Sequence, residues 1–103
     1  MDRIEKLQAF LQQTPDDCFL NHALALEYVK LGDDDKAKTF FEKNMNHDSL
    51  YIATYYHLGK LMARKGNEQE AMKLFVVGMN VAKSANDMHT YSELQSAYDE
   101  IAY

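Results

Sequence analysis

The chain has 103 residues, which is the length of a single domain. Apolar residues make up 47% and charged residues 26% of it, a composition typical of a soluble globular protein and not of a disordered one. The formal net charge of −5 argues against nucleic-acid binding, because neutralising phosphates requires a concentrated positive surface. One proline and four glycines leave few interruptions, so long helices are favoured over many short strands.

Features that would direct the chain to a membrane or an oxidising compartment are weak or missing in the sequence. No apolar run approaches the roughly 20 residues of a membrane helix, and the charged start lacks the apolar core of a signal peptide. Cys18 is the single cysteine, which excludes an internal disulfide and a zinc site built from several thiolates. We therefore expect a cytoplasmic protein without membrane contact.

Apolar residues recur at the spacing of a helix face almost throughout the chain. The first stripe, at 4–11, ends at the turn 14–17, where a proline breaks the pattern and aspartates are suited to cap the next helix. Five further helices are predicted at about 20–31, 34–46, 50–65, 68–84 and 88–101. Short polar turns join the helices, and no strand is expected.

Two segments of the chain repeat each other. The stretch LALEYVKLG from Leu24 aligns with LGKLMARKG from Leu58, and the alignment continues beyond both glycines. The paired positions are Leu24 with Leu58, Ala25 with Gly59, Gly32 with Gly66, Ala37 with Ala71, and Phe41 with Phe75. A unit of helix, glycine turn and helix with a period of about 34 residues resembles the tetratricopeptide repeat (TPR).

The resemblance implies an all-α fold, a right-handed α-solenoid of antiparallel helix pairs with about six helices. Two full repeats, at 18–51 and 52–85, are expected between a half-repeat helix at 1–17 and a C-terminal capping helix at 86–103, all in one domain. The pattern departs from the family where Tyr55 replaces tryptophan, Met62 replaces tyrosine and Ser49 replaces the late proline.

Three consecutive aspartates, Asp33 to Asp35, follow the first glycine turn. A calcium loop that starts at Asp33 would need a glycine where Lys38 stands and a glutamate where Asn44 stands. The aspartates are instead predicted to cap the helix that follows and to favour its positive end. Asn67 and Glu68 are expected to do the same in the second repeat.

Metal and catalytic sites are not expected. The four histidines form no ligand motif, and the serines and Cys18 lack the sequence context of an activated nucleophile. We therefore predict a protein that is not an enzyme, with no metal and no cofactor.

The family resemblance implies a concave surface, lined by the first helix of each repeat, that receives extended peptides. By register, this surface is assigned the side chains Phe19, His22, Leu26, Lys30, Tyr56, His57, Lys60 and Arg64. Lys60 and Arg64 are one helical turn apart, so they could hold a carboxylate or phosphate, with Tyr56 and His57 stacking beside it. The alternative is a solvated basic pair and an aromatic residue packed against its neighbour.

One subset of the family clamps a chaperone's C-terminal carboxylate, but the corresponding positions here do not match that clamp; they are His22, Leu26, His57, Asp87 and Tyr91. The resemblance therefore implies an adaptor that binds a peptide or protein segment of unknown identity in a concave groove. The alternative function is a self-associating structural protein, a weak homodimer formed through an exposed apolar face of a terminal helix. Seven tyrosines and six methionines supply the apolar surface for such an association.

Overall fold

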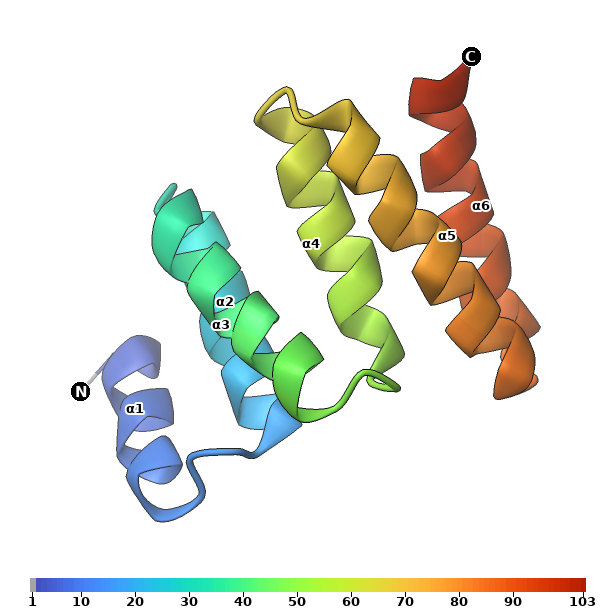
Figure 1. Ribbon diagram of the computed structural model, residues 1–103. Coiled ribbons are helices and arrows are strands. Elements are labelled where there is room, and N and C mark those ends of the chain that lie inside the picture. The colour runs from blue at the N-terminus through green and yellow to red at the C-terminus, as the bar shows by residue number, and fades with distance from the viewer. Residues whose placement is uncertain (1) are drawn as a thin grey trace. The chain divides into compact units, whose positions relative to one another are not determined.

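The computed structural model describes residues 2–103, which form six α-helices and no strand (Figure 1). The helices are α1 (Arg3–Gln13), α2 (Cys18–Lys30), α3 (Asp34–His47), α4 (Ile52–Arg64), α5 (Glu68–Ser84) and α6 (Met88–Ala102). The predicted all-helical fold is thereby confirmed. None of these helices combines the length and apolar character that crossing a bilayer requires, as far as residues 2–103 show.

The fourth helix begins at Ile52, slightly later than predicted. Asp48 explains the difference, because it holds Leu50 and Tyr51, the residues just before the helix, in a turn. Its Oδ1 accepts a hydrogen bond from the Leu50 N–H at 3.0 Å, and its backbone carbonyl accepts one from the Tyr51 N–H at 3.1 Å.

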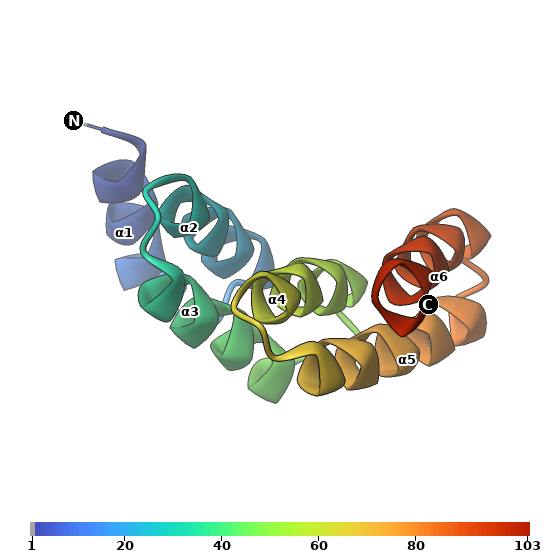
Figure 2. The same cartoon turned by 90° about the horizontal axis from the view of Figure 1, so that it is seen from above.

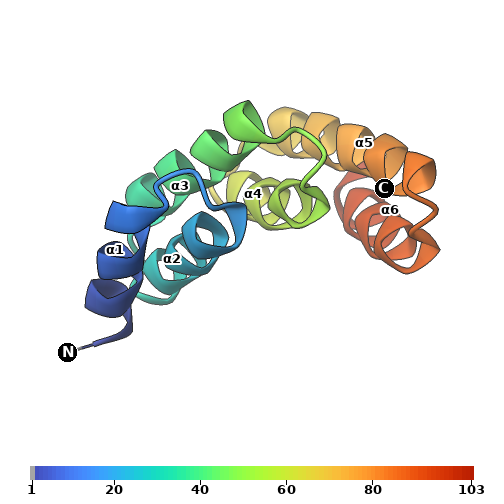
Figure 3. The ribbon, with the colours of Figure 1, turned by 90° about the horizontal axis from the view of Figure 1, so that it is seen from below.

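The helices divide into two compact units, an N-terminal unit that extends to Tyr51 and a C-terminal unit from Ile52 to Tyr103. In the N-terminal unit α2 packs against both α1 and α3. In the C-terminal unit α5 packs against both α4 and α6, and these two helices lie on the same side of α5 (Figures 2 and 3). The C-terminal unit therefore presents two neighbouring helices on one face.

The glycine turn within each unit has the same geometry. Gly32 and Gly66 have φ angles of +79° and +87°, a left-handed conformation that other residues rarely adopt. The next N–H in each turn reaches back into the preceding helix, from Asp33 to the Tyr28 carbonyl and from Asn67 to the Met62 carbonyl, both at 2.9 Å. These bonds satisfy carbonyls at the helix end and reverse the chain direction.

The residue after each glycine caps the helix that follows the turn, α3 in the N-terminal unit and α5 in the C-terminal unit. The Asp33 side chain accepts a hydrogen bond from the Lys36 N–H at 3.2 Å, and the Asn67 side chain accepts one from the Glu70 N–H at 3.4 Å. The prediction that the aspartate run caps a helix is therefore confirmed at Asp33. Asparagine does the same without charge, so the shared requirement is a side-chain oxygen.

The turn before α2 is tied down by two side chains. Asp17 caps α2 through a 2.9 Å hydrogen bond from the Leu20 N–H, as the sequence predicts for this aspartate pair. The buried Asn21 side chain donates hydrogen bonds to the carbonyls of Pro15 and Asp17, each at 3.0 Å. Asn21 thereby holds the turn against the first turn of the helix.

Close packing of small against large residues forms the core of the C-terminal unit. The ring of Phe75 occupies the space that a Cβ atom at Gly59 would need. A Cβ at Gly78 would lie 2.7 Å from the Tyr55 Cβ and 3.1 Å from a methyl carbon of Leu94. Gly59 therefore allows α5 to approach α4, and Gly78 allows it to approach both α4 and α6.

The N-terminal unit fills the corresponding positions differently. Asn21 and Asn44 are the counterparts, one repeat earlier, of Tyr55 and Gly78. The buried Asn44 side chain donates a 2.9 Å hydrogen bond to the carbonyl of Cys18, which joins α3 to the start of α2. Side-chain hydrogen bonds of Asn21 and Asn44 in this unit thus replace the packing of Tyr55 against Gly78 in the other unit.

The last helix is apolar on one side only. Leu94 and Ala97 are buried, whereas Ser92, Gln95 and Ser96 are exposed. This division leaves a polar outer face on α6.

Candidate peptide-binding groove

Two hollows lie one after the other between α4 and α6 of the C-terminal unit, and we call them together the α4–α6 groove. The first hollow has a volume of about 380 Å³ and is lined by Ile52, Ala53, Tyr56, His57, Asp87, Thr90 and Glu93. The second hollow has a volume of about 330 Å³ and is lined by Lys60, Ala63, Arg64, Phe75, Ala97, Glu100 and Ile101. Figure 2 shows the two helices that form its walls.

All four residues that the sequence assigns to the second repeat lie in this groove. Tyr56 and His57 line the first hollow, and Lys60 and Arg64 line the second. Their spacing along α4 places them on one side of the helix, because residues three and four apart lie above one another.

The aromatic residues of α4 form a wall of the first hollow. The rings of Tyr56 and His57 are nearly perpendicular, at 83°, with their centroids 5.3 Å apart. The Lys60 ammonium group lies 6.0 Å from the centroid of the Tyr56 ring, at the outer limit of a cation–π interaction. Tyr56 of the first hollow is therefore a neighbour of Lys60, which lines the second.

Carboxylates of α6 and of its N-cap Asp87 face this wall. The sequence did not assign them to the groove, although Asp87 was compared with the chaperone-tail clamp. Asp87 and Glu93 line the first hollow, and Glu100 lines the second. The Lys60 Nζ lies 3.4 Å from Glu100 Oε2, with side chains that are 42% and 66% exposed. A pair with this exposure is weak and is screened by salt.

The repeat contains a partial signal for these missed residues. Asp87 and Thr90 stand one repeat after Ala53 and Tyr56, so the register itself places them on a lining face. Glu93 has no comparable signal, because its counterpart in the repeat is the buried Gly59.

The environment of the first hollow changes the pKa of two lining groups. Burial lowers the pKa of His57 below its ordinary value, although the nearby Glu93 carboxylate acts in the opposite direction. The pKa of Asp87 is lowered first by the hydrogen bond from the Thr90 N–H at 3.1 Å and then by that from the Thr90 hydroxyl at 2.8 Å. At neutral pH the imidazole is thus uncharged and the carboxylate is ionised.

The four residues assigned in the N-terminal unit are not gathered in the same way. His22 is only 8% exposed, and its ring lies 5.7 Å from that of Phe41 and 5.8 Å from that of Tyr51. Leu26 is partly buried, while Lys30 is exposed with its Nζ 3.4 Å from Glu27 Oε2.

Phe19 belongs to a different part of the N-terminal unit. It is 66% exposed and lines a hollow of about 420 Å³ together with Phe10 of α1. His22, Leu26 and Lys30 do not line that hollow.

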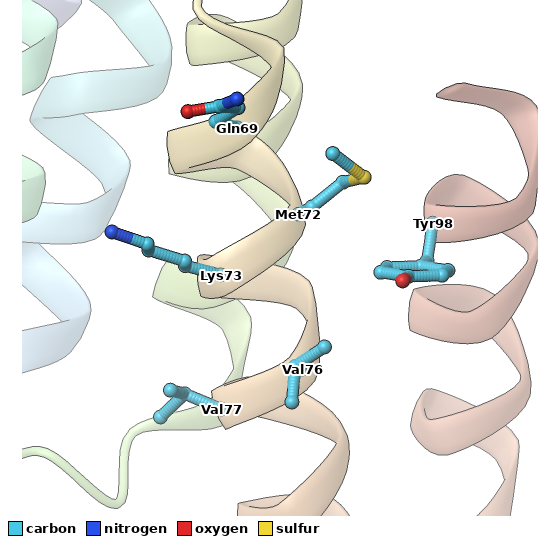
Figure 4. A pocket seen from close by; sticks show the side chains of 6 residues that line it. All are labelled: Gln69, Met72, Lys73, Val76, Val77 and Tyr98. Atoms are coloured by element: carbon cyan, nitrogen blue, oxygen red, sulfur yellow. The ribbon is translucent and has the colours of Figure 1, made fainter. Parts of the chain in front are cut away.

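A second surface of the C-terminal unit is more apolar, and we call it the α5–α6 face. The hollow on this face has a volume of about 560 Å³, and its lining residues are Gln69, Met72, Lys73, Val76, Val77 and Tyr98. Figure 4 shows Met72 and Val76 on the side of α5 that faces Tyr98, with Lys73 and Val77 directed away from it. Val76 and Val77 are 41% and 46% exposed, which is high for valine.

Cys18 has the environment of a protonated thiol. Burial raises its pKa, and the carboxylates of Asp48, Asp17 and Asp16 raise it further. A thiol is a poor nucleophile compared with its thiolate. Among residues 2–103, no three His, Cys, Asp or Glu side chains are grouped as ligands of a metal ion would be.

Solved structures of TPR domain proteins have the same fold. A TPR domain protein from Salinibacter ruber has a crystal structure that is 35% identical, with a TM-score of 0.80, covering 84% of this chain and 96% of that chain. A solution structure of a TPR domain protein from the same organism is 36% identical, with a TM-score of 0.81 and coverage of 84% and 88%. A protein from Bordetella parapertussis is 25% identical, with a TM-score of 0.85 and coverage of 99% and 89%.

Comparison by sequence agrees with these structures. The family description "Tetratricopeptide repeat" matches residues 20–43. A search of the curated proteins finds no match.

The fold is that of a helical-repeat protein, and the chain belongs to the tetratricopeptide repeat family. The family resemblance and the helical solenoid predicted from the sequence are thereby confirmed. TPR folds are generally protein-interaction modules, and TPR proteins are generally scaffolds without enzymatic activity.

Proposed function

We propose that this chain is an adaptor that binds an extended segment of a partner protein in the α4–α6 groove. The observation that carries the proposal is the position of Tyr56, His57, Lys60 and Arg64, which open into two consecutive hollows from one side of α4. Hollows of this kind take up side chains of a segment that runs along the groove. The proposal includes a cytoplasmic location, which the single cysteine favours.

Lys60 and Arg64 give the second hollow its attraction for acidic groups. Glu100 already offers a carboxylate to Lys60 at 3.4 Å, so an acidic side chain of the partner would compete with it. The exchange costs little because the existing pair is largely solvated. Ala63 and Ile101, which are only partly buried, supply apolar surface beside the charged groups.

The N-terminal unit adds further proposed contacts. Phe19 and Lys30 are exposed and available to a partner, and Leu26 is partly so. His22 offers little surface, and we propose that it supports α2 through its contacts with Phe41 and Tyr51.

Selection from a random heptapeptide display library tests the adaptor proposal. The selected peptides should be titrated against the wild-type chain and against the double variant Lys60→Ala and Arg64→Ala. We expect roughly tenfold weaker binding by the double variant, which corresponds to about 1.4 kcal/mol. Lys73→Ala with Lys83→Ala is the matched control, because both lysines are exposed on α5 and lie outside the groove.

The adaptor proposal fails if no peptide is selected, or if the groove variant and the control variant bind the selected peptides equally. Circular dichroism of both variants should show the wild-type helix content, so that a loss of binding is not a loss of fold.

Self-association is a second candidate function, and the α5–α6 face favours it. Val76 and Val77 expose apolar surface there, and Tyr98 of the terminal helix extends it. Sedimentation over a concentration series should detect a weak homodimer that Val76→Glu abolishes, since a charge in an apolar interface is costly. A strict monomer at millimolar concentration would remove this candidate.

A further inference from the structure

The first hollow of the α4–α6 groove differs in charge from the second. Two carboxylates line it, Asp87 and Glu93, and the described residues contribute no Lys or Arg to its lining. Its one imidazole, that of His57, has a pKa below the ordinary value because it is buried. The hollow is therefore negative at neutral pH, although the sequence alone suggested a groove for acidic groups.

The walls of the first hollow suit a long basic side chain. Ile52 and Ala53 are apolar, and the Tyr56 ring offers a face that attracts cations. Lys and Arg side chains combine an apolar stem with a charged end, and they bury the stem while the charge meets a polar group. Asp87 and Glu93 provide such groups at the same hollow.

Both carboxylates retain capacity for a further hydrogen bond. Asp87 accepts one bond at each oxygen from Thr90, and an ionised carboxylate has about four acceptor positions. The Glu93 side chain is 51% exposed, and its Oε1 lies 3.4 Å from Nε2 of the more exposed His89.

We propose that the first hollow binds a lysine or arginine side chain of the partner, so that the groove selects a segment with both a basic and an acidic residue. This inference rests on the adaptor function proposed above, and it adds the charge pattern of the ligand.

The spacing of the two hollows sets the spacing of the two charges. Corresponding residues of the hollows are seven positions apart on each helix, as His57 and Arg64 are on α4 and Glu93 and Glu100 are on α6. At about 1.5 Å per residue of helix, the separation is about 10 Å. A segment in the polyproline II conformation rises about 3.1 Å per residue with three residues per turn, so about three residues cover this distance and direct both side chains to the same side. The ligand therefore carries its basic residue about three positions from its acidic residue, in either order.

The experiment is a selection from the same random heptapeptide display library with three forms of the chain. The wild type should enrich peptides with Lys or Arg about three positions from Asp or Glu. Glu93→Lys places a positive charge in the first hollow, so its selected peptides should lose the basic residue. Peptides selected by the wild type should bind this variant at least fivefold more weakly. Asp99→Lys is the matched control, since it makes the same charge change at an exposed site on α6 outside both hollows.

The outcomes separate this inference from the adaptor proposal. Enrichment of acidic peptides without a paired basic residue, unaltered by Glu93→Lys, would overturn the inference and leave the adaptor function standing. An equal loss of binding by Glu93→Lys and Asp99→Lys would also overturn it, because the effect would then be one of net charge. Failure to enrich any peptide would overturn both proposals.

Discussion

The Phe75 ring in α5 lies against Gly59 in α4, in the space where any other residue would place its Cβ atom. Phe75 is 1% exposed, so the contact is fully inside the C-terminal unit. The repeat in the N-terminal unit has Ala25 at the position of Gly59 and Phe41 at that of Phe75. The two units therefore fill the same pair of positions with different residue pairs, and both pairs are buried.

Gly59→Ala should destabilise the protein. Alanine is the better helix former by about 1 kcal/mol, but displacing a packed ring typically costs about 1–3 kcal/mol. We expect a lower midpoint of urea unfolding. Ala25→Gly is the matched change at the aligned position. It should cost about 1 kcal/mol from lost helix propensity and about 0.8 kcal/mol from the lost methyl group, because Ala25 is fully buried. A Gly59→Ala variant more stable than the wild type would show that the ring moves aside without cost.

Asp33→Ala should cost about 1 kcal/mol of stability, because it removes the oxygen that accepts the Lys36 N–H at the start of α3. Asp33→Asn should be nearly neutral, since Asn67 performs the same role in the other unit. Thermal unfolding of the two variants measures the difference. Equal losses in both would indicate that the negative charge, and not the hydrogen bond, matters at this helix end.

Stability should fall on acidification because of His57. Its pKa is lowered in the folded protein and has the ordinary value of about 6.5 in the unfolded chain. Between these two values the unfolded state binds more protons, so the free energy of unfolding falls as the pH falls below about 6.5.

Urea unfolding at a series of pH values from 8 to 5 should show this decline, and His57→Gln should reduce its slope. Glutamine keeps a polar side chain at the site without titrating. A slope that is unchanged in the variant would contradict the assignment to His57.

Glu100→Gln should raise the affinity for an acidic peptide. The change removes the carboxylate that lies 3.4 Å from the Lys60 ammonium group, and Lys60 then has no competitor for the ligand there. The gain should be a few-fold, because exposed ion pairs contribute about 0.2–1 kcal/mol. Titration of the acidic peptide against both proteins at low and at high salt measures this gain in affinity. The gain should be smaller at high salt, because salt screens the interaction between the charges. Weaker binding by this variant would show that Glu100 contacts the ligand.

Short-range rules account for the parts of the structure that could be predicted. Helix faces follow from spacing within a few residues, and turns follow from a glycine beside a side chain that caps. Gly32 with Asp33 and Gly66 with Asn67 are local combinations of this kind. Their recurrence in the same register indicates the family, because the same local structure must pack in the same way each time.

Side-chain exposure could not be predicted from the repeat. His22 and Tyr56 hold the same place in successive repeats, yet His22 is 8% exposed among aromatic rings and Tyr56 lines an open hollow. The neighbours of each position come from other helices, and those neighbours differ between the two units.

By itself, the sequence determined the six helices and the two repeated turns, because each depends on residues close together in the chain. The resemblance to the repeat family, and not local spacing alone, assigned the α4 residues of the groove. Only the tertiary structure decided the charge of the groove. Lys60 and Glu100 are 40 positions apart, and their approach depends on how α4 and α6 both pack on α5. Packing brought the carboxylates of α6 to the aromatic wall of α4, and it changed a site expected to bind acids into one with both signs of charge.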